Sequence, residues 1–199
     1  MTLGPAPALI FDFDGTLVDT MPIHFEAYRQ TFAEAGIELA PGEFYAHIGG
    51  KASETIPRFL AGRPCGRSVA ELHARKQVIA VELLASEPIP VLAAATLLQA
   101  WHGAAPIALA SSGSRSGIEL VLERLGWRAM FDVVVTGGDV ARGKPAPDLF
   151  LLAAERLGVA PPRCLVFEDT DDGVAAARAA QMAVFDVRLA PAPSLARAR

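Results

Sequence analysis

The 199-residue chain has little cysteine, no excess of basic residues and no long hydrophobic run. Its two cysteines, Cys65 and Cys164, form neither a CxxC pair nor a spacing typical of zinc ligands. No uncharged apolar run reaches the roughly 18 residues that a membrane-spanning helix needs. The first residues show no basic region followed by an apolar core, so we expect no signal peptide and a cytoplasmic location.

The charge balance is mildly acidic, with 22 acidic against 18 basic residues and a formal net charge of −4. Such a balance provides no electrostatic attraction to nucleic acid or to an anionic membrane, and neither is expected as a partner. Hydrophobic residues make up 52% of the chain, which is typical of a compact globular protein. No long apolar patch stands out, so we expect a monomer.

Short apolar runs bounded by turn residues recur along the chain and predict buried strands. Cys164 stands at the start of one of them and is expected to be a buried thiol. Segments with helical spacing separate the runs, which indicates an α/β fold with a parallel sheet and right-handed crossovers. The predicted strands lie at 8–11, 107–110, 133–135, 165–167 and 183–187.

The interval between the first two strands breaks this alternation, because it contains only helical patterns, at about 20–35, 42–46, 52–61 and 68–86. We therefore predict a core domain of residues 1–15 and 90–199, with a helical cap domain of residues 16–89 inserted after the first strand. The proline-rich stretch at 87–90 is the expected return hinge.

Polar residues follow four of the predicted strands directly, at the sheet edge where open parallel sheets bind ligands. Asp12 and Asp14 are two residues apart, so their side chains point to the same side where the strand ends. The other groups are Ser111 and Ser112 with Arg115 nearby, Lys144 before a proline, and Glu168 with Asp169.

This set of residues restricts the chemistry. Clustered carboxylates repel one another unless a cation lies between them, and oxygen ligands without His or Cys suit Mg²⁺. A carboxylate such as Asp12 can also act as the nucleophile of a phosphoryl transfer. Lys144 and a serine hydroxyl would then hold phosphate oxygens, while Asp14 would protonate the leaving oxygen and later accept a proton from water.

Each motif has an ordinary structural explanation when taken singly. The Asp pair could be a turn or helix cap, the lysine a solvated loop residue, and the serine cluster a helix N-cap. Asp171 and Asp172 are interpreted as helix caps only. Four such features in order, each directly after a strand, favour one shared site. Other phosphate-binding motifs are absent from the sequence. No GxGxxG follows the first strand, and the segment around Lys51 lacks a P-loop pattern.

These motifs resemble the haloacid dehalogenase (HAD) superfamily over nearly the whole chain. DFDGTLVD at 12–19 is similar to its first motif, Ser111 to the second, Lys144 in GKPAPD to the third, and Glu168-Asp169 to the fourth. The resemblance implies a Rossmann-like core with a small all-helical cap. It also implies Asp12 as nucleophile, Asp14 as general acid/base, and a Mg²⁺ site made by Asp12, the Asp14 carbonyl, Glu168 and Asp169.

The helical insert resembles the β-phosphoglucomutase-like branch, whose cap–core signature fits Thr20 and His24. His24 would align Asp14, or it is an ordinary helix-surface histidine. The segments at 87–90, 101–103 and 186–189 are most similar to small bacterial fructose-1-phosphate-type phosphatases. The resemblance implies substrate binding by Gly15, Thr16, Thr20, His24, Gly49, Ser112 and Arg115.

Three positions depart from or qualify that pattern. Gly49 stands where the mutase branch carries a lysine, with Lys51 two places later, which weakens the mutase interpretation. Arg115 would bind a distal phosphate, or it is a surface charge at a helix start. Gln181 occupies a helix end where a glycine is common, since glycine accepts a left-handed backbone.

The expected function is Mg²⁺-dependent hydrolysis of a small sugar phosphate through an aspartyl phosphate. One alternative is a β-phosphoglucomutase that returns the phosphoryl group to the sugar. Another is a non-catalytic relative, against which the complete acid set argues.

Overall fold

The computed structural model describes residues 7–48 and 52–189, and their centre is a five-stranded parallel sheet. The strands stand in the order β3-β2-β1-β4-β5. All five predicted strands are confirmed, with ends that differ by at most one residue. They are β1 (Ala8–Phe11), β2 (Ile107–Ser111), β3 (Val133–Thr136), β4 (Cys164–Glu168) and β5 (Ala183–Asp186).

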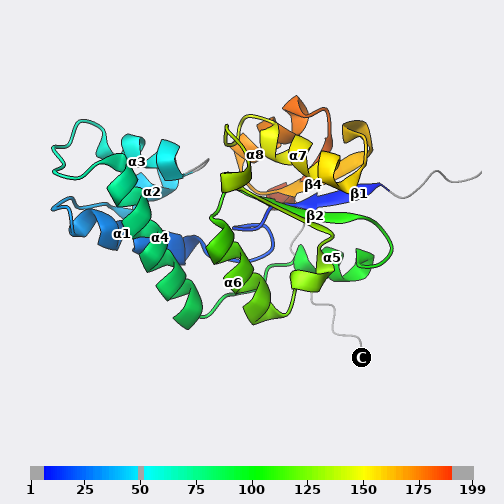
Figure 1. The fold of residues 1–199 in the computed structure, drawn as a ribbon, viewed down its shortest axis with the longest axis horizontal. Helices are drawn as coiled ribbons and strands as arrows, with labels where there is room; N and C mark the ends of the chain where they lie inside the picture. The colour runs from blue at the N-terminus through cyan, green and yellow to red at the C-terminus, as the bar shows by residue number, and fades with distance from the viewer. Residues whose placement is uncertain (1–6, 49–51, 190–199) are drawn as a thin grey trace, which may run out of the picture.

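Helices cover both faces of the sheet, as the uniformly apolar strands predict (Figure 1). Helices α5 (Ala95–Trp101) and α6 (Arg115–Leu125) pack on one face, where Leu9 and Phe11 point. Helices α7 (Asp148–Leu157) and α8 (Asp171–Ala179) pack on the other face, where Ala8 and Ile10 point. The α/β fold class is confirmed, and Cys164 is buried as expected, with 2% of its surface exposed.

Between β1 and β2 lie the four helices that the sequence predicts, and they form a lobe beside the sheet (Figure 1). The lobe has a hydrophobic core of its own, built around Tyr28, Phe32, Phe44 and Phe59. Its longest helix begins with a capping box, in which Ser68 and Glu71 bond reciprocally. The helices are α1 (Met21–Ala33), α2 (Pro41–His47), α3 (Ala52–Leu60) and α4 (Val69–Ser86).

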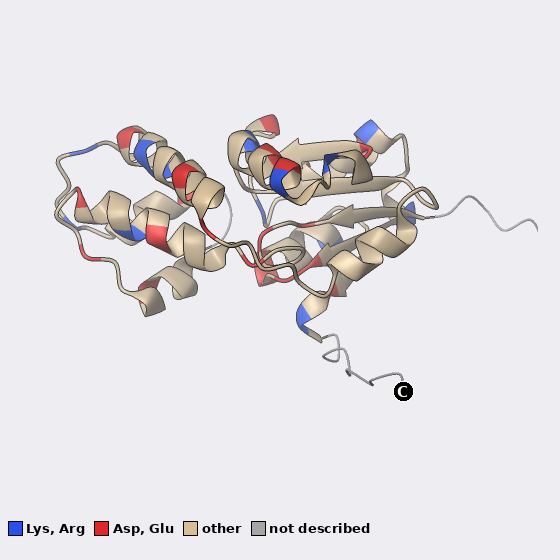
Figure 2. Cartoon of the chain, turned by 90° about the horizontal axis from the view of Figure 1, so that it is seen from below, with Lys and Arg blue, Asp and Glu red and all other residues tan. Residues whose placement is uncertain are grey.

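Two chain segments join the lobe to the sheet, and they lie side by side. The Asp19 amide donates to the Pro90 carbonyl at 2.9 Å, and the Leu92 amide donates to the Leu17 carbonyl at 2.9 Å. Arg124 of α6 donates to the Leu84 and Glu87 carbonyls at the end of α4. Acidic positions colour this junction red in Figure 2. The proline-rich 87–90 segment therefore lies at the point where the chain re-enters the sheet.

Helix α5 is absent from the sequence-based expectation. It has only seven residues and no side-chain cap, and its buried face consists of Ala95 and Leu98 alone. A single i, i+3 pair is too short a pattern to separate a helix from a loop. In the described part of the chain, no helix has the length and apolar character needed to cross a bilayer.

Gln181 has a left-handed backbone, with φ of 59°, at the end of α8. A non-glycine residue there costs about 1–2 kcal/mol. We predict that Gln181→Gly raises the free energy of unfolding by about 0.5–1 kcal/mol, because glycine removes this strain but loses more backbone entropy on folding. Urea denaturation measures the change.

The matched control is Ala175→Gly, at an exposed position within α8 itself. There the same new residue is expected to destabilise the protein by about 1 kcal/mol, since the backbone is helical. Destabilisation in both variants would contradict the strain at residue 181.

Candidate active site

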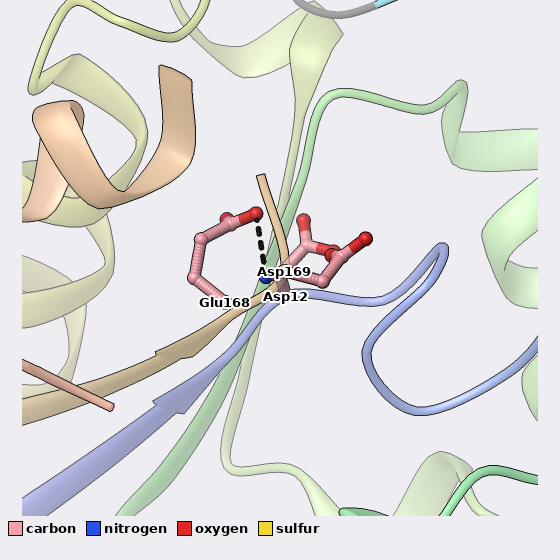
Figure 3. A group of neighbouring side chains, drawn as sticks. All are labelled: Asp12, Glu168 and Asp169. Carbon is pink, nitrogen blue, oxygen red and sulfur yellow. Dashed lines mark hydrogen bonds between the residues drawn. The ribbon is translucent and has the colours of Figure 1, made fainter. Parts of the chain in front are cut away.

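Three carboxyl groups meet where β1 and β4 end. The two strands pair with Phe11 opposite Phe167, whose rings stack at 4.5 Å between centroids. Asp12 directly follows β1, Glu168 ends β4, and Asp169 comes next. Each offers an oxygen within 4.8 Å of the others. Figure 3 shows all three rising from the strand ends toward the same side.

Lys144 neutralises part of this charge. Its ammonium donates to Asp12 Oδ1 at 2.5 Å and to Glu168 Oε2 at 2.7 Å, and its side chain is 5% exposed. Burial opposes the charged ammonium, but the two carboxylates outweigh it and hold the pKa of Lys144 well above its usual value. The pKa of Asp12 is raised, by burial first and by Glu168 second, against the opposing pull of Lys144.

The two acids of β4 differ in how far their oxygens are engaged. Glu168 is fully buried, and while Oε2 binds Lys144, Oε1 accepts from the amides of Asp169 and Thr170 and from the Thr170 hydroxyl. Asp169 accepts from the Thr16 hydroxyl at 2.8 Å through Oδ1. Burial, reinforced by Glu168, raises the pKa of Asp169 to about 6. Asp169 is therefore freer than Glu168 to take a further ligand.

Two glycines make room for these acids. A Cβ on Gly15, whose φ is +94°, would lie 2.2 Å from Asp169 Oδ2. A Cβ on Gly173 would lie 2.0 Å from the Glu168 carboxyl carbon. Both distances are shorter than any real contact, so a larger residue at either position would displace a carboxylate.

The donor set fits a hard divalent cation. Three carboxylates face a single ammonium, and burial raises the pKa of both Asp12 and Asp169. A bound cation would relieve this excess of negative charge, and all three side chains offer oxygen alone. Asp12 and Asp169 are the side chains with oxygens to spare. The metal contacts of Glu168 and of the Asp14 carbonyl stay predictions.

Asp14 stands in a different environment from Asp12. Its Oδ1 accepts from the Thr20 hydroxyl at 2.5 Å and lies 3.2 Å from His24 Nε2, and its Oδ2 accepts from the Ser111 hydroxyl at 3.1 Å. Burial opposes ionisation, but the charge of His24 and these hydrogen bonds outweigh it. They hold the pKa of Asp14 well below its usual range.

Lys76 of α4 extends this network from the lobe, and the sequence analysis missed it. Its ammonium lies 3.3 Å from His24 Nδ1 and 4.9 Å from the centre of the Tyr28 ring. Burial lowers the pKa of Lys76 to about 8.

These groups open onto a cavity of about 680 Å³ between the sheet and the lobe. Asp12, Asp14 and Lys144 line it from the sheet side. Ser111 and Ser112 line it beside them, and the buried hydroxyl oxygen of Ser112 has no hydrogen-bond partner within the described residues. From the lobe come Met21, His24, Tyr28, Ile48, Ala52, His73, Lys76, Gln77, Ala80 and Leu84.

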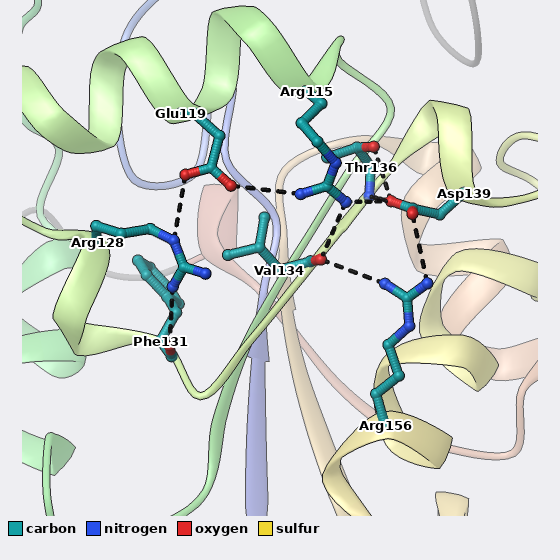
Figure 4. Close-up of polar contacts among 8 residues, drawn as sticks. All are labelled: Arg115, Glu119, Arg128, Phe131, Val134, Thr136, Asp139 and Arg156. Atoms are coloured by element: carbon teal, nitrogen blue, oxygen red, sulfur yellow. Dashed lines mark hydrogen bonds and ion pairs between the residues drawn. The ribbon is translucent and has the colours of Figure 1, made fainter.

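Arg115 lies on the same cavity, but its guanidinium is already engaged. It pairs with Asp139 at 2.6 Å and with Glu119 at 3.3 Å, while Arg156 and Arg128 contact these acids from the other side (Figure 4). Binding a distal phosphate would require Arg115 to exchange Asp139 for the substrate. That role stays a prediction.

The remaining residues expected to bind substrate differ in their surroundings. Thr16 and Thr20 are buried, and their hydroxyls orient Asp169 and Asp14. Gly15 packs against Asp169. Gly49 lies outside the described residues.

Comparison with known proteins agrees with this geometry. Residues 6–181 match the model of the haloacid dehalogenase-like hydrolase family. The chain belongs to that family. It is 40% identical over 184 residues to fructose-1-phosphate phosphatase YqaB of Escherichia coli (strain K12), covering 91% of this chain and 96% of that protein. It is an enzyme, a phosphoric monoester hydrolase of the haloacid dehalogenase-like family.

Solved structures share the fold. CbbY from Rhodobacter sphaeroides in complex with phosphate superposes with a TM-score of 0.84 and 31% identity, covering 90% of this chain and 84% of that one. β-Phosphoglucomutase from Clostridium difficile gives a TM-score of 0.79 and 26% identity, with 91% and 84% coverage. The Rossmann-like haloacid dehalogenase fold is thus confirmed, including its resemblance to the mutase branch.

We predict that Lys144→Met costs about 3–5 kcal/mol of folding free energy, because it leaves Asp12 and Glu168 buried without their shared cation. Denaturant unfolding in metal-free buffer measures the loss. Arg142→Met is the control, since Arg142 stands on the same loop and pairs with Asp148 in solvent. A loss at Lys144 no larger than in this control would show that the buried ion pair contributes nothing to stability.

Proposed function

We propose that this enzyme hydrolyses a small sugar phosphate, using Asp12 as the nucleophile and Mg²⁺ as its cofactor. The observation that carries the proposal is the difference between two aspartates two residues apart. Asp12 lies against Lys144 and the acids of β4, while Asp14 is held by two hydroxyls and His24. The sugar is inferred from the likeness to the fructose-1-phosphate phosphatase.

In the first step an Asp12 oxygen attacks phosphorus, and the bond from phosphorus to the sugar oxygen breaks. Asp14 gives its proton to that oxygen, and the sugar leaves as an alcohol. In the second step Asp14 takes a proton from water, the water oxygen attacks phosphorus, and the bond to Asp12 breaks. Inorganic phosphate is released and both carboxyl groups return to their starting states.

The first step needs a protonated Asp14, although its surroundings favour the ionised form. A phosphate dianion arriving in the cavity adds negative charge, which raises the pKa of a neighbouring carboxyl group. We infer that Asp14 takes up its proton as the substrate binds. The ionised form that the empty cavity favours is the one that the second step requires.

Lys144 contributes without moving. An ammonium has three protons, and two of them bind Asp12 and Glu168, which leaves one for a phosphate oxygen. The Ser111 hydroxyl donates to Asp14 in the empty cavity. With substrate bound, it would donate to a phosphate oxygen instead. When bound by Asp12, Asp169 and the Asp14 carbonyl, Mg²⁺ would neutralise charge on the phosphoryl group.

We further propose that residues 16–89 act as a cap domain over a core of residues 1–15 and 90–199. The separate hydrophobic core of the lobe and the paired segments at its base support this division. Closing the lobe over the cavity would exclude bulk water during the first transfer, and opening would release the sugar.

A mutase is the second candidate, because the fold is also shared with a β-phosphoglucomutase. Adding β-glucose 1-phosphate distinguishes the two reactions, since a phosphatase releases free phosphate and a mutase accumulates glucose 6-phosphate.

We predict that Asp12→Asn lowers kcat at least about 10³-fold on fructose 1-phosphate, because an amide oxygen is a poor nucleophile. Asp14→Asn is expected to stop turnover while substrate still binds. Phosphate release and calorimetric titration measure the two effects. Asp19→Asn is the control and should keep its activity, as Asp19 lies outside the cavity lining. Normal turnover by Asp12→Asn would remove this mechanism.

Chelation tests the proposed cofactor. We predict that EDTA abolishes phosphate release and that Mg²⁺ restores it. Mg²⁺ should also raise the midpoint of thermal unfolding of the wild type and of the control Asp172→Asn, but not that of Asp169→Asn. Full activity in metal-free buffer would contradict the metal site.

A further inference from the structure

Helix α4 presents a continuous stripe of side chains to the cavity. His73, Lys76, Gln77, Ala80 and Leu84 all line it, at the spacing of one helix face. The ammonium of Lys76 already contacts His24. The half-buried His73 and Gln77 are polar cavity residues that the proposed chemistry does not use.

His73 and Gln77 bind each other, with Gln77 Nε2 at 2.9 Å from His73 Nε2. An amide nitrogen can only donate, so the imidazole accepts at Nε2 and carries its proton on Nδ1. This neutral form agrees with the pKa of His73, which burial and the charge of Lys76 lower. The pair is therefore uncharged.

The pair keeps both kinds of group for a ligand: His73 Nδ1–H and the second amide N–H of Gln77 can donate, and Gln77 Oε1 can accept. Turning the amide around would move the imidazole proton and exchange these roles, but both kinds would remain. A hydroxyl group both donates and accepts, so it satisfies the pair. A second phosphate or a carboxylate only accepts, so it could bind the N–H groups but would leave the amide oxygen without a donor.

We propose that His73 and Gln77 bind hydroxyl groups on the non-reacting end of the substrate and so select a polyhydroxylated monophosphate. This inference rests on the proposed function, because the phosphate end of the same molecule must lie at Asp12. The two residues act in recognition and not in the transfer itself, so their removal is expected to raise KM more than it lowers kcat.

The test compares two phosphate donors. One is the hexose monophosphate that the wild type hydrolyses fastest among fructose 1-phosphate, glucose 1-phosphate and glucose 6-phosphate. The other is acetyl phosphate, which has no hydroxyl groups and is too short to extend along α4. The readout is the ratio of kcat/KM for the hexose phosphate to kcat/KM for acetyl phosphate.

We expect Gln77→Met and His73→Leu each to lower this ratio about tenfold or more, through KM, because each leaves a substrate hydroxyl unpaired. His73→Gln, which keeps a donor and an acceptor, should restore part of the ratio. Val78→Ala is the matched control on α4, since Val78 is 49% exposed and does not line the cavity. Its ratio should equal that of the wild type.

Two results would overturn the inference. An equal loss on both donors would assign the pair to the stability of α4, which thermal unfolding would also show. An unchanged ratio in both variants would mean that the pair does not contact the substrate. Failure of the proposed function looks different, since the wild type would then release no phosphate from any of the four phosphate donors.

Discussion

The site depends on one buried ammonium held between two carboxylates. Lys144 lies between Asp12 and Glu168, and without it the ends of β1 and β4 would bring negative charges together away from water. The other oxygen of Glu168 accepts hydrogen bonds from the backbone amides of Asp169 and Thr170, just before α8 begins. The same side chain therefore binds Lys144 and the start of the helix. Asp12 is left with an oxygen directed at the cavity, beside Asp169. Stability and chemistry are thus coupled at this point, because the arrangement that makes Asp12 available also holds two strand ends in register.

Two surfaces with different tasks enclose the cavity. The sheet edge supplies rigid acids and one cation, positioned by hydrogen-bonded strands. The lobe supplies His24, Lys76, His73 and Gln77 from helices that have their own core. This separation explains how one core can serve relatives as different as a phosphatase and a mutase. The transferring group meets the same residues, while the rest of the substrate meets helices that can vary without disturbing the sheet.

The sequence predicted the sheet side of the site well, because its residues follow strands directly. Asp12 and Asp14 are fixed by side-chain alternation, and parallel strands bring their carboxyl ends to one edge. The lobe side was largely missed. Lys76 and Gln77 sit on a helix with polar residues on more than one face, and only the packing of α4 against the core shows which face meets the cavity. The metal contact of Glu168 stays a prediction, while its hydrogen bonds to Thr170 involve a backbone turn that spacing alone does not reveal. Arg115 was left with two interpretations, and its pairing with Asp139 depends on a loop after another strand.

The central claim is that Asp12 becomes phosphorylated during turnover. Its most direct test mixes the wild-type enzyme with fructose 1-phosphate and Mg²⁺, quenches in acid within the first turnovers, and reduces with borohydride before peptide mapping. The account predicts that residue 12, and no other carboxyl group, is converted to homoserine, the reduction product of an aspartyl phosphate. An unmodified Asp12 peptide recovered while phosphate is being released would contradict it.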